Sequence, residues 1–418
     1  MDRRNFLASL GAAGAWAALG CGHRAAAGDA AAGAMATGAA TGAAPAGTET
    51  RKAWAELMEL LREAEARTLS PEWGIRRPAD VADGHRYLLH VLHSALDQKL
   101  EADPLRPQAV RFVKPNLKLL GDNPDAIYYT APVHPERRYR VRGNTSGAVY
   151  TSLTIEGGNA DGGYPDRVAG ALNDTEFDVD SEGRFEVTLG PGLEGRNRLA
   201  LEPDAGTLTT RHYFENRFAA AIDPRVRVEL VVEPLDETPP PPTPSDASIA
   251  RGIRRAANYF RAATLDMTPR DPAQQPDWVS MVPNQFNAPR KWKAGEGGFG
   301  AVDNAYAMAP YALGPDQALV IDGRWPRARF GSVVLWNRFM QTYDYANRQV
   351  SLNRAQTVPK EDGSFRMVIA HRDPRVPNWI DAEGRPSGLV FWRFQLPEED
   401  IVTPQAQVVP VDAVSALG

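Results

Sequence analysis

Residues 318–396 carry the clearest strand pattern of the chain and read ALVIDGRWPRARFGSVVLWNRFMQTYDYANRQVSLNRAQTVPKEDGSFRMVIAHRDPRVPNWIDAEGRPSGLVFWRFQL. Short apolar runs alternate here with Gly, Pro, Asp and Asn, which is typical of strands joined by turns. We expect strands within Ala318–Ile321, Ser332–Trp336, Phe365–Ala370 and Leu389–Leu396.

An earlier part of the chain repeats this pattern in the same order and at a nearly constant offset. YRVRG at 139–143 corresponds to LVIDG at 319–323, and GRFEVTL at 183–189 corresponds to GSFRMVI at 363–369. DAIYYTAP at 125–132 likewise corresponds to DNAYAMAP at 303–310, and Arg211 falls on Arg393. No single match is meaningful, but their common order predicts two copies of one β-rich unit.

The composition is that of an ordinary globular protein of two or three domains. The 418 residues are 43% hydrophobic and 24% charged, the net charge is −5, and there are 36 Gly and 34 Pro. Basic residues are scattered, so a nucleic-acid partner is not expected. We predict a mainly β protein with a few helices (α+β). It would contain two tandem β-sandwich or jelly-roll units of similar plan, each preceded by an amphipathic helix.

The N-terminus resembles a twin-arginine export signal over residues 1–21. Arg3 and Arg4 precede a weakly apolar run that is too short to span a bilayer. Cys21 ends this run and is the only cysteine, so no internal disulfide can form, and lipidation at Cys21 is one reading of it. We therefore expect an exported protein of the periplasm or cell envelope, with membrane attachment only through such a lipid anchor. Residues 22–48 are mostly Ala and Gly, which predicts a disordered tether.

The remaining chain divides by its periodicity. Apolar residues at three- and four-residue spacing predict helices near 50–66, 82–100 and 249–265. The predicted domains are a helical segment (49–110), a first β domain (111–235), a Pro-rich linker (236–246) and a helix plus second β domain (247–418).

Metal binding is not predicted. His85, His90 and His93 lie on one predicted helix, but at about 100° per residue they do not share one face. The sequence shows no cofactor motif, and it leaves the cofactor and the oligomeric state open.

Comparison of the two copies indicates where chemistry is concentrated. The second copy has gained aromatic, amide and guanidinium groups at its strand ends, where β-sandwich proteins often hold ligands. The expected ligand-binding residues are Trp336, Asn337, Arg338, Tyr343, Asn347, Arg372 and Trp379, with Asp125 and Tyr128 from the first copy. His371 and Asp373 are the candidate catalytic pair. The alternative is that they form only an Asp-Pro turn.

Two segments resemble a bacterial family known as domain of unknown function 1214, often preceded by a domain numbered 1254. These are GDNPDAIYYTAPVHPERRYRVRG at 121–143 and HRDPRVPNWIDAEGRPSGLVFWRF at 371–394. The resemblance implies β-sandwich or jelly-roll domains. It implies no activity and no catalytic residues.

The expected function is binding of a small organic or saccharide-like ligand in the C-terminal β lobe, because aromatic faces and polar side chains suit such ligands. One alternative is an exported hydrolase or lyase that uses His371 with Asp373 or Asp125. Another is a structural envelope module that assembles through sheet edges.

Overall fold

The computed structural model describes residues 47–267, 275–292 and 303–417. The expected export signal, Cys21 and almost all of the expected tether lie outside these residues. Within them, no helix has both the length and the apolar character needed to cross a bilayer. The described residues form one compact unit.

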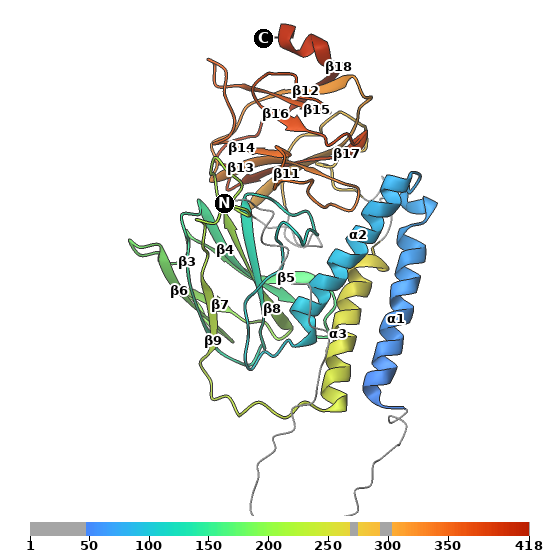
Figure 1. Ribbon diagram of the computed structural model, residues 1–418. Helices are drawn as coiled ribbons and strands as arrows, with labels where there is room; N and C mark the ends of the chain where they lie inside the picture. Colours follow the sequence, from blue (N-terminus) through green and yellow to red (C-terminus); the bar gives the residue numbers. More distant parts are fainter. Residues whose placement is uncertain (1–46, 268–274, 293–302, 418) are drawn as a thin grey trace, which may run out of the picture. The chain divides into compact units, whose positions relative to one another are not determined.

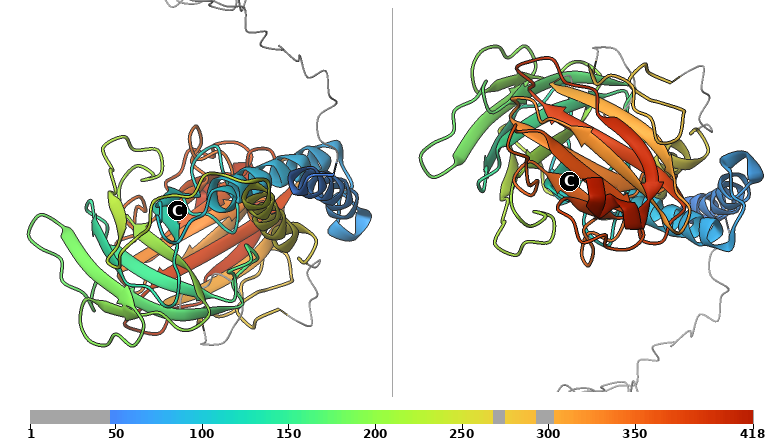
Figure 2. Two further views of the ribbon diagram at one scale, coloured as in Figure 1. Left: turned by 90° about the horizontal axis from the view of Figure 1, so that it is seen from below. Right: turned by 90° about the horizontal axis from the view of Figure 1, so that it is seen from above.

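Three long helices pack together beside the strands (Figures 1 and 2). Thr48 caps the first helix by accepting a hydrogen bond from Arg51 N, and Ser245 caps the third through Ser248 N. Their apolar faces share one core, in which Leu60, Val91 and others surround α3. The helices are α1 (Glu49–Thr68), α2 (Pro78–Ala95) and α3 (Asp246–Thr264), with short turns η1 (Pro71–Trp73), η2 (Leu96–Leu100) and η4 (Val411–Leu417).

The first β lobe consists of a five-stranded sheet and a four-stranded sheet. The larger sheet has the order β1-β2-β8-β4-β5, and the smaller has the order β7-β6-β3-β9. The strands are β1 (Val110–Arg111), β2 (Ala126–Pro132), β3 (Tyr139–Asn144), β4 (Tyr150–Gly157), β5 (Arg167–Asn173), β6 (Arg184–Gly190), β7 (Arg198–Ala200), β8 (Ala205–Tyr213) and β9 (Leu230–Pro234).

The second β lobe has the same two-sheet organisation. Its five-stranded sheet has the order β10-β11-β17-β13-β14, and its four-stranded sheet has the order β16-β15-β12-β18. The strands are β10 (Arg290–Lys291), β11 (Asn304–Ala312), β12 (Gln317–Gly323), β13 (Phe330–Trp336), β14 (Ser351–Asn353), β15 (Phe365–Ala370), β16 (Trp379–Asp381), β17 (Ser387–Gln395) and β18 (Gln405–Pro410).

The two lobes correspond strand by strand. In the first five-stranded sheet, β8 lies between β2 and β4. In the second, the equivalent strand β17 lies between β11 and β13. Both four-stranded sheets contain one parallel pair, β6 with β7 and β15 with β16, beside antiparallel neighbours. The predicted fold class is therefore confirmed. It includes two similar β units, the first preceded by α1 and α2 and the second by α3. The exact domain boundaries stay a prediction.

Each lobe has its own apolar core between its two sheets. Leu153, Ile155 and Leu208 fill the first core, and Val333 and Trp392 help to fill the second. These residues occupy alternate positions along their strands, as expected where one face of a sheet packs inward. The other face of each five-stranded sheet is also covered, because nearly every residue of β4, β8, β13 and β17 is buried.

The turn before β2 joins the first lobe to the second. Gly121 N donates to the Met340 carbonyl (2.9 Å), and the Trp336 indole N–H donates to the Asp122 carbonyl (2.8 Å). Gly121 has a φ of 72°, and a Cβ there would lie 2.8 Å from the Trp336 ring. Only glycine suits both the conformation and the space.

An ion pair fixes a second joint between the lobes. Arg354 donates from Nε and Nη2 to the two carboxylate oxygens of Glu215, at 2.6 and 2.8 Å. Glu215 also accepts from Gly331 N (2.9 Å), and Arg354 also donates to the Ala328 carbonyl (2.8 Å). Both side chains are largely buried, so loss of one partner leaves the other unsatisfied.

We predict that Arg354→Met lowers the free energy of unfolding by about 2 kcal/mol, because Glu215 then keeps a partly buried charge without its main donor. Urea unfolding followed by circular dichroism measures this change. The matched control is Arg62→Met, which removes an exposed pair with Glu59 and should change stability by less than about 0.5 kcal/mol. Equal losses in the two variants would contradict this account of the joint.

Candidate ligand-binding site

The outer face of the first lobe's five-stranded sheet is polar and yet buried. On β8, Thr207, Thr209 and Arg211 occupy alternate positions, and on β4 Thr154 and Glu156 alternate with the core residues Leu153 and Ile155. Helical elements and the second lobe cover this face. Buried polar groups need hydrogen-bond partners. A ligand or bound water at this face would supply such partners.

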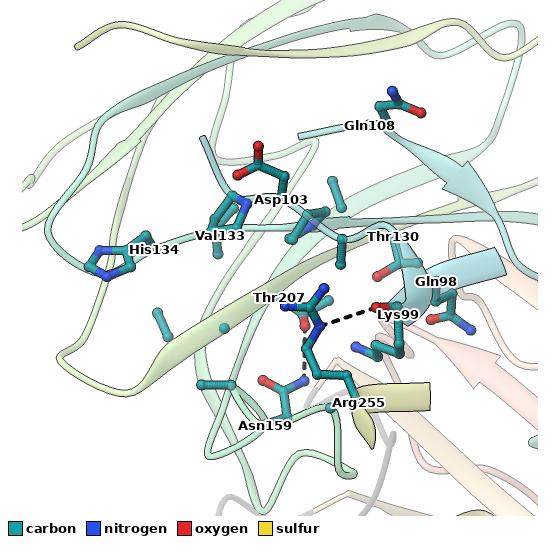
Figure 3. Close-up of a pocket in the computed structure, with 18 of the residues that line it drawn as sticks. Gln98, Lys99, Asp103, Gln108, Thr130, Val133, His134, Asn159, Thr207 and Arg255 are labelled. Atoms are coloured by element: carbon teal, nitrogen blue, oxygen red, sulfur yellow. Dashed lines mark hydrogen bonds between the residues drawn. The ribbon is translucent and has the colours of Figure 1, made fainter. Parts of the chain in front are cut away.

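A cavity of about 460 Å³ opens at one end of this face. Its wall is formed by η2 and the chain after it, the ends of β2 and β8, the loop around Asn159, and Arg255 of α3. Figure 3 shows Lys99, Thr207 and Asn159 grouped on one side of it, with His134 at some distance. Asn159 Nδ2 donates to Thr207 Oγ1 (2.9 Å). We call this cavity the mouth; its volume lies in the usual range for small-ligand pockets.

Arg255 shapes the mouth through backbone contacts. Its Nε donates to the Lys99 carbonyl (3.2 Å) and its Nη2 donates to the Leu100 carbonyl (3.3 Å). The guanidinium thus satisfies carbonyls at the end of a helical segment, where intrahelical donors are missing.

The Lys99 ammonium lines the mouth without an ion-pair partner in the described part of the chain. The residue is only 8% exposed, and in the described part of the chain its ammonium makes no hydrogen bond and has no carboxylate within 4.0 Å. Its closest recorded neighbour is the Tyr259 ring, with Nζ 5.7 Å from the centroid. Burial lowers the pKa of Lys99, and the Glu156 carboxyl acts in the opposite direction.

A small third cavity, which we call the passage, lies next to the mouth. It has a volume of about 10 Å³ and shares Lys99 and Thr207 with the mouth. Glu156 lines it and lies 3.8 Å from Arg211 Nη2. Burial raises the pKa of Glu156, and Arg211 opposes that shift. Arg211 Nη1 donates to Thr154 Oγ1 (2.7 Å).

A second cavity of about 50 Å³ lies between the two lobes, and we call it the inner chamber. Phe112 and Leu120 line both the passage and the inner chamber. Arg211 and Arg393, one from each lobe, line the inner chamber together with Tyr128, Tyr213, Tyr306, Asn304 and Asp122. The mouth, the passage and the inner chamber therefore follow one polar sheet face from solvent to the joint between the lobes.

Two of the predicted ligand-binding residues, Trp336 and Arg338, hold the second lobe against the N-terminal part, and two others, Asn337 and Tyr343, bond within the second lobe. Trp336 stacks on Phe391 (4.2 Å between centroids) in addition to its bond to Asp122. Arg338 Nη1 donates to the Trp73 and Gly74 carbonyls, at 2.8 and 2.6 Å. Asn337 binds within its own turn, and the Tyr343 hydroxyl bonds that of Tyr311 (2.7 Å).

The other predicted residues of the second lobe do not gather around a cavity of the described structure. Asn347 donates to Asp344 (2.8 Å), and Arg372 donates to Asp412 (2.8 Å). The Trp379 indole N–H donates to the Ala370 carbonyl (3.2 Å). A ligand-binding role for these residues stays a prediction.

The candidate catalytic pair is not joined in the structure. Asp373 Oδ1 accepts from Arg375 N (2.7 Å), which is the turn-capping alternative. His371 Nε2 lies 3.5 Å from the Leu313 carbonyl. No hydrogen bond or ion pair connects His371 with Asp373 or with Asp125 among the described residues.

The two predicted site residues of the first lobe lie near the inner chamber. Tyr128 lines it and donates to the Tyr213 hydroxyl (3.2 Å). Asp125, completely buried, stands just before β2 at the joint between the lobes. Burial raises the pKa of Asp125 to about 8. The Asn353 side chain and Arg393 oppose this shift of the pKa, and Glu215 adds to it.

Histidines of α2 take up ordinary contacts. His85 lies 3.0 Å from Glu65, and His90 bonds to the backbone of Lys118. Across residues 47–267, 275–292 and 303–417, no three groups of metal-ligating type come together.

A wider depression of about 790 Å³ lies over β3, β6 and β9. Its charged residues are exposed and pair with one another, such as Arg184 with Asp180 (2.8 Å). Unlike the mouth and the inner chamber, this depression has, among its described lining residues, no buried polar side-chain atom without a hydrogen-bond partner.

Sequence reasoning did not identify the residues of the mouth and passage as a site. Lys99 belongs to an amphipathic pattern, and the Thr and Arg residues of β8 alternate as a solvated strand face would. One usable signal was present, because the internal repeat superposes Arg211 on Arg393, and both line the inner chamber.

Comparisons with known proteins identify the fold and no activity. The chain is structurally similar to an uncharacterized protein from Burkholderia cenocepacia, with a TM-score of 0.73 and 26% identity over 87% of this chain and 98% of that one. A Vibrio parahaemolyticus protein matches with a TM-score of 0.46 and 11% identity, covering 84% of this chain and 100% of that one. No family model and no curated protein matches the chain.

We predict that Asp125 makes the protein less stable as the pH rises from about 4 to about 8. In this window the folded state keeps the Asp125 proton, while the unfolded state releases it near pH 4. The folded state therefore binds more protons, and the free energy of unfolding falls by up to about 1.4 kcal/mol per pH unit. Asp125→Asn, which is always neutral, should remove this component.

Urea unfolding at pH 5, 6, 7 and 8 tests this slope as the difference between the wild type and Asp125→Asn. The control is Asp373→Asn, which changes an exposed carboxylate and should keep the wild-type slope. Parallel pH profiles for the wild type and Asp125→Asn would show that Asp125 does not hold its proton in the folded protein.

Proposed function

We propose that this protein binds a small organic ligand in the mouth, with an acceptor group of the ligand, such as a carboxylate, directed at Lys99. The observation that carries the proposal is the nearly buried Lys99 ammonium, which has no protein acceptor in the described structure. A buried ammonium without a partner is costly. A ligand anion or acceptor would remove that cost.

The other groups of the mouth support a mixed polar and apolar ligand. Ala131, Val133 and Pro203 provide apolar surface, while Gln98, Asn159 and Thr207 provide donors and acceptors. Most charged neighbours are already paired: Arg106 with Asp103 (2.9 Å) and Arg167 with Asp204 (2.5 Å). Of these charged groups, the Lys99 ammonium is therefore the one that an anionic ligand would stabilise most.

The proposal keeps the small organic ligand expected from the sequence and places it in the first lobe. It also retains export to the periplasm or envelope, which rests on the Arg3-Arg4 leader, with a possible lipid anchor at Cys21. We further propose kinship with the domain of unknown function 1214 family, supported by the two resembling segments and by the shared β-sandwich architecture.

A thermal-shift screen of small organic acids, sugar acids and neutral sugars tests the proposal. We expect one or more acids to raise the melting temperature in proportion to concentration. For an acid found in this way, Lys99→Met should weaken binding by about 10- to 100-fold, because a hydrogen bond to a charged group is lost. Isothermal titration calorimetry measures the change.

The matched control is Lys52→Met, which removes an exposed ammonium of α1 paired with Glu49. Its affinity for the same acid should equal that of the wild type. Unchanged affinity in a folded Lys99→Met protein would exclude the mouth as the binding site of that acid.

A further inference from the structure

Arg393 is a buried cation without a counter-charge. It extends from β17 into the inner chamber and is only 7% exposed. Its Nε and Nη1 have no hydrogen-bond partner, and Nη2 reaches the Gly121 carbonyl at 3.5 Å, a long contact. In the described part of the chain, no carboxylate oxygen lies within 4.0 Å of the guanidinium. An arginine side chain does not lose its proton in proteins, so the buried positive charge remains.

The aromatic rings around Arg393 offset only part of this cost. Its guanidinium carbon lies 5.1 Å from the centre of the Phe391 ring, 5.5 Å from that of Tyr213 and 5.9 Å from that of Tyr306. At these distances the ring faces attract the guanidinium electrostatically. They leave the unpaired N–H groups unsatisfied.

The carboxyl groups nearest the inner chamber are otherwise engaged or tend to be neutral. Glu156 faces Arg211, which is the other arginine of the inner chamber. Asp122 lines the chamber, but burial raises its pKa, and its Oδ1 accepts from Thr342 N (3.0 Å). Burial likewise raises the pKa of Asp125. In the described part of the chain, none of these carboxyl groups forms an ion pair with Arg393.

The inner chamber is also polar on its remaining surface. Asn304 and Asp122 each have a buried oxygen without a hydrogen-bond partner, and Tyr128 and Tyr213 contribute hydroxyl groups. The volume of about 50 Å³ exceeds what a single water requires. A small ligand with one negative charge fits both the space and the charge.

We propose that the inner chamber is a binding site for a small monoanionic carboxylate, held by Arg393 and placed between the two lobes. The anion accepts hydrogen bonds from Arg393 Nε or Nη1 and neutralises the guanidinium. This site is separate from the mouth, and the inference does not depend on what the mouth binds. Because its walls come from both lobes, the anion also ties the lobes together.

Trifluoroacetate is a suitable probe, observed by ¹⁹F NMR at constant ionic strength, with trifluoroethanol as the neutral control. The wild type should broaden the trifluoroacetate signal, and acetate should reverse the broadening, while trifluoroethanol should be unaffected. Arg393→Met should weaken trifluoroacetate binding at least about 10-fold. The matched control, Arg324→Met, removes a half-exposed guanidinium near Asp362 and should bind like the wild type.

The variants also distinguish the inner chamber from the mouth. Trifluoroacetate binding that survives in Lys99→Met and is lost in Arg393→Met supports the inner chamber. Loss in Lys99→Met with retention in Arg393→Met places the probe in the mouth and overturns this inference. So does a wild type that does not distinguish trifluoroacetate from trifluoroethanol, which would indicate that water alone fills the chamber.

If Arg393→Met does not fold, a crystal of the wild type soaked in trifluoroacetate decides the question. Density for the anion within hydrogen-bond distance of Arg393 Nε or Nη1 supports the site. Ordered water alone at that position overturns it.

Discussion

The structure depends on covering the polar outer face of the first lobe's five-stranded sheet. This face carries Thr207, Thr209, Arg211 and Glu156, and all four are buried. Polar groups removed from water must be satisfied or they destabilise the fold. The helical elements cover one end of the face, and the second lobe covers the other (Figure 1). The cavities along it lie where this cover does not fill the space.

The same constraint explains why the two lobes are bound so closely. Each lobe has its own apolar core and does not need the other lobe to form that core. The polar sheet face of the first lobe, however, would be exposed to solvent without the second lobe, and the inner chamber would not exist. The turn at Gly121 and the pair Arg354–Glu215 fix the spacing between the lobes. Arg211 of β8 and Arg393 of β17, which are equivalent in the repeat, both line the inner chamber. The inner chamber is therefore lined by residues of both copies of the repeated unit.

Much of the fold was predictable from local patterns. The strand alternation, the offset between copies and the helix periodicities led to two similar β units that follow helices, as observed. The site was harder to predict, because the side chains of β8 alternate as they would beside solvent. Only the tertiary cover converts Arg211 and Lys99 into buried, functional candidates. Conversely, Trp336, Asn337 and Arg338 were predicted to bind a ligand, whereas Trp336 and Arg338 contact the N-terminal part of the chain and Asn337 bonds within its own turn.

We propose that the buried polar face of the first lobe holds a ligand. The most direct measurement is a crystal structure at about 1.5 Å resolution of protein purified without added organic acids. We expect ordered density other than protein, in contact with Lys99 in the mouth or with Arg393 in the inner chamber. A structure in which both cations reach carboxylates of the protein itself, with the cavities closed around them, would contradict it.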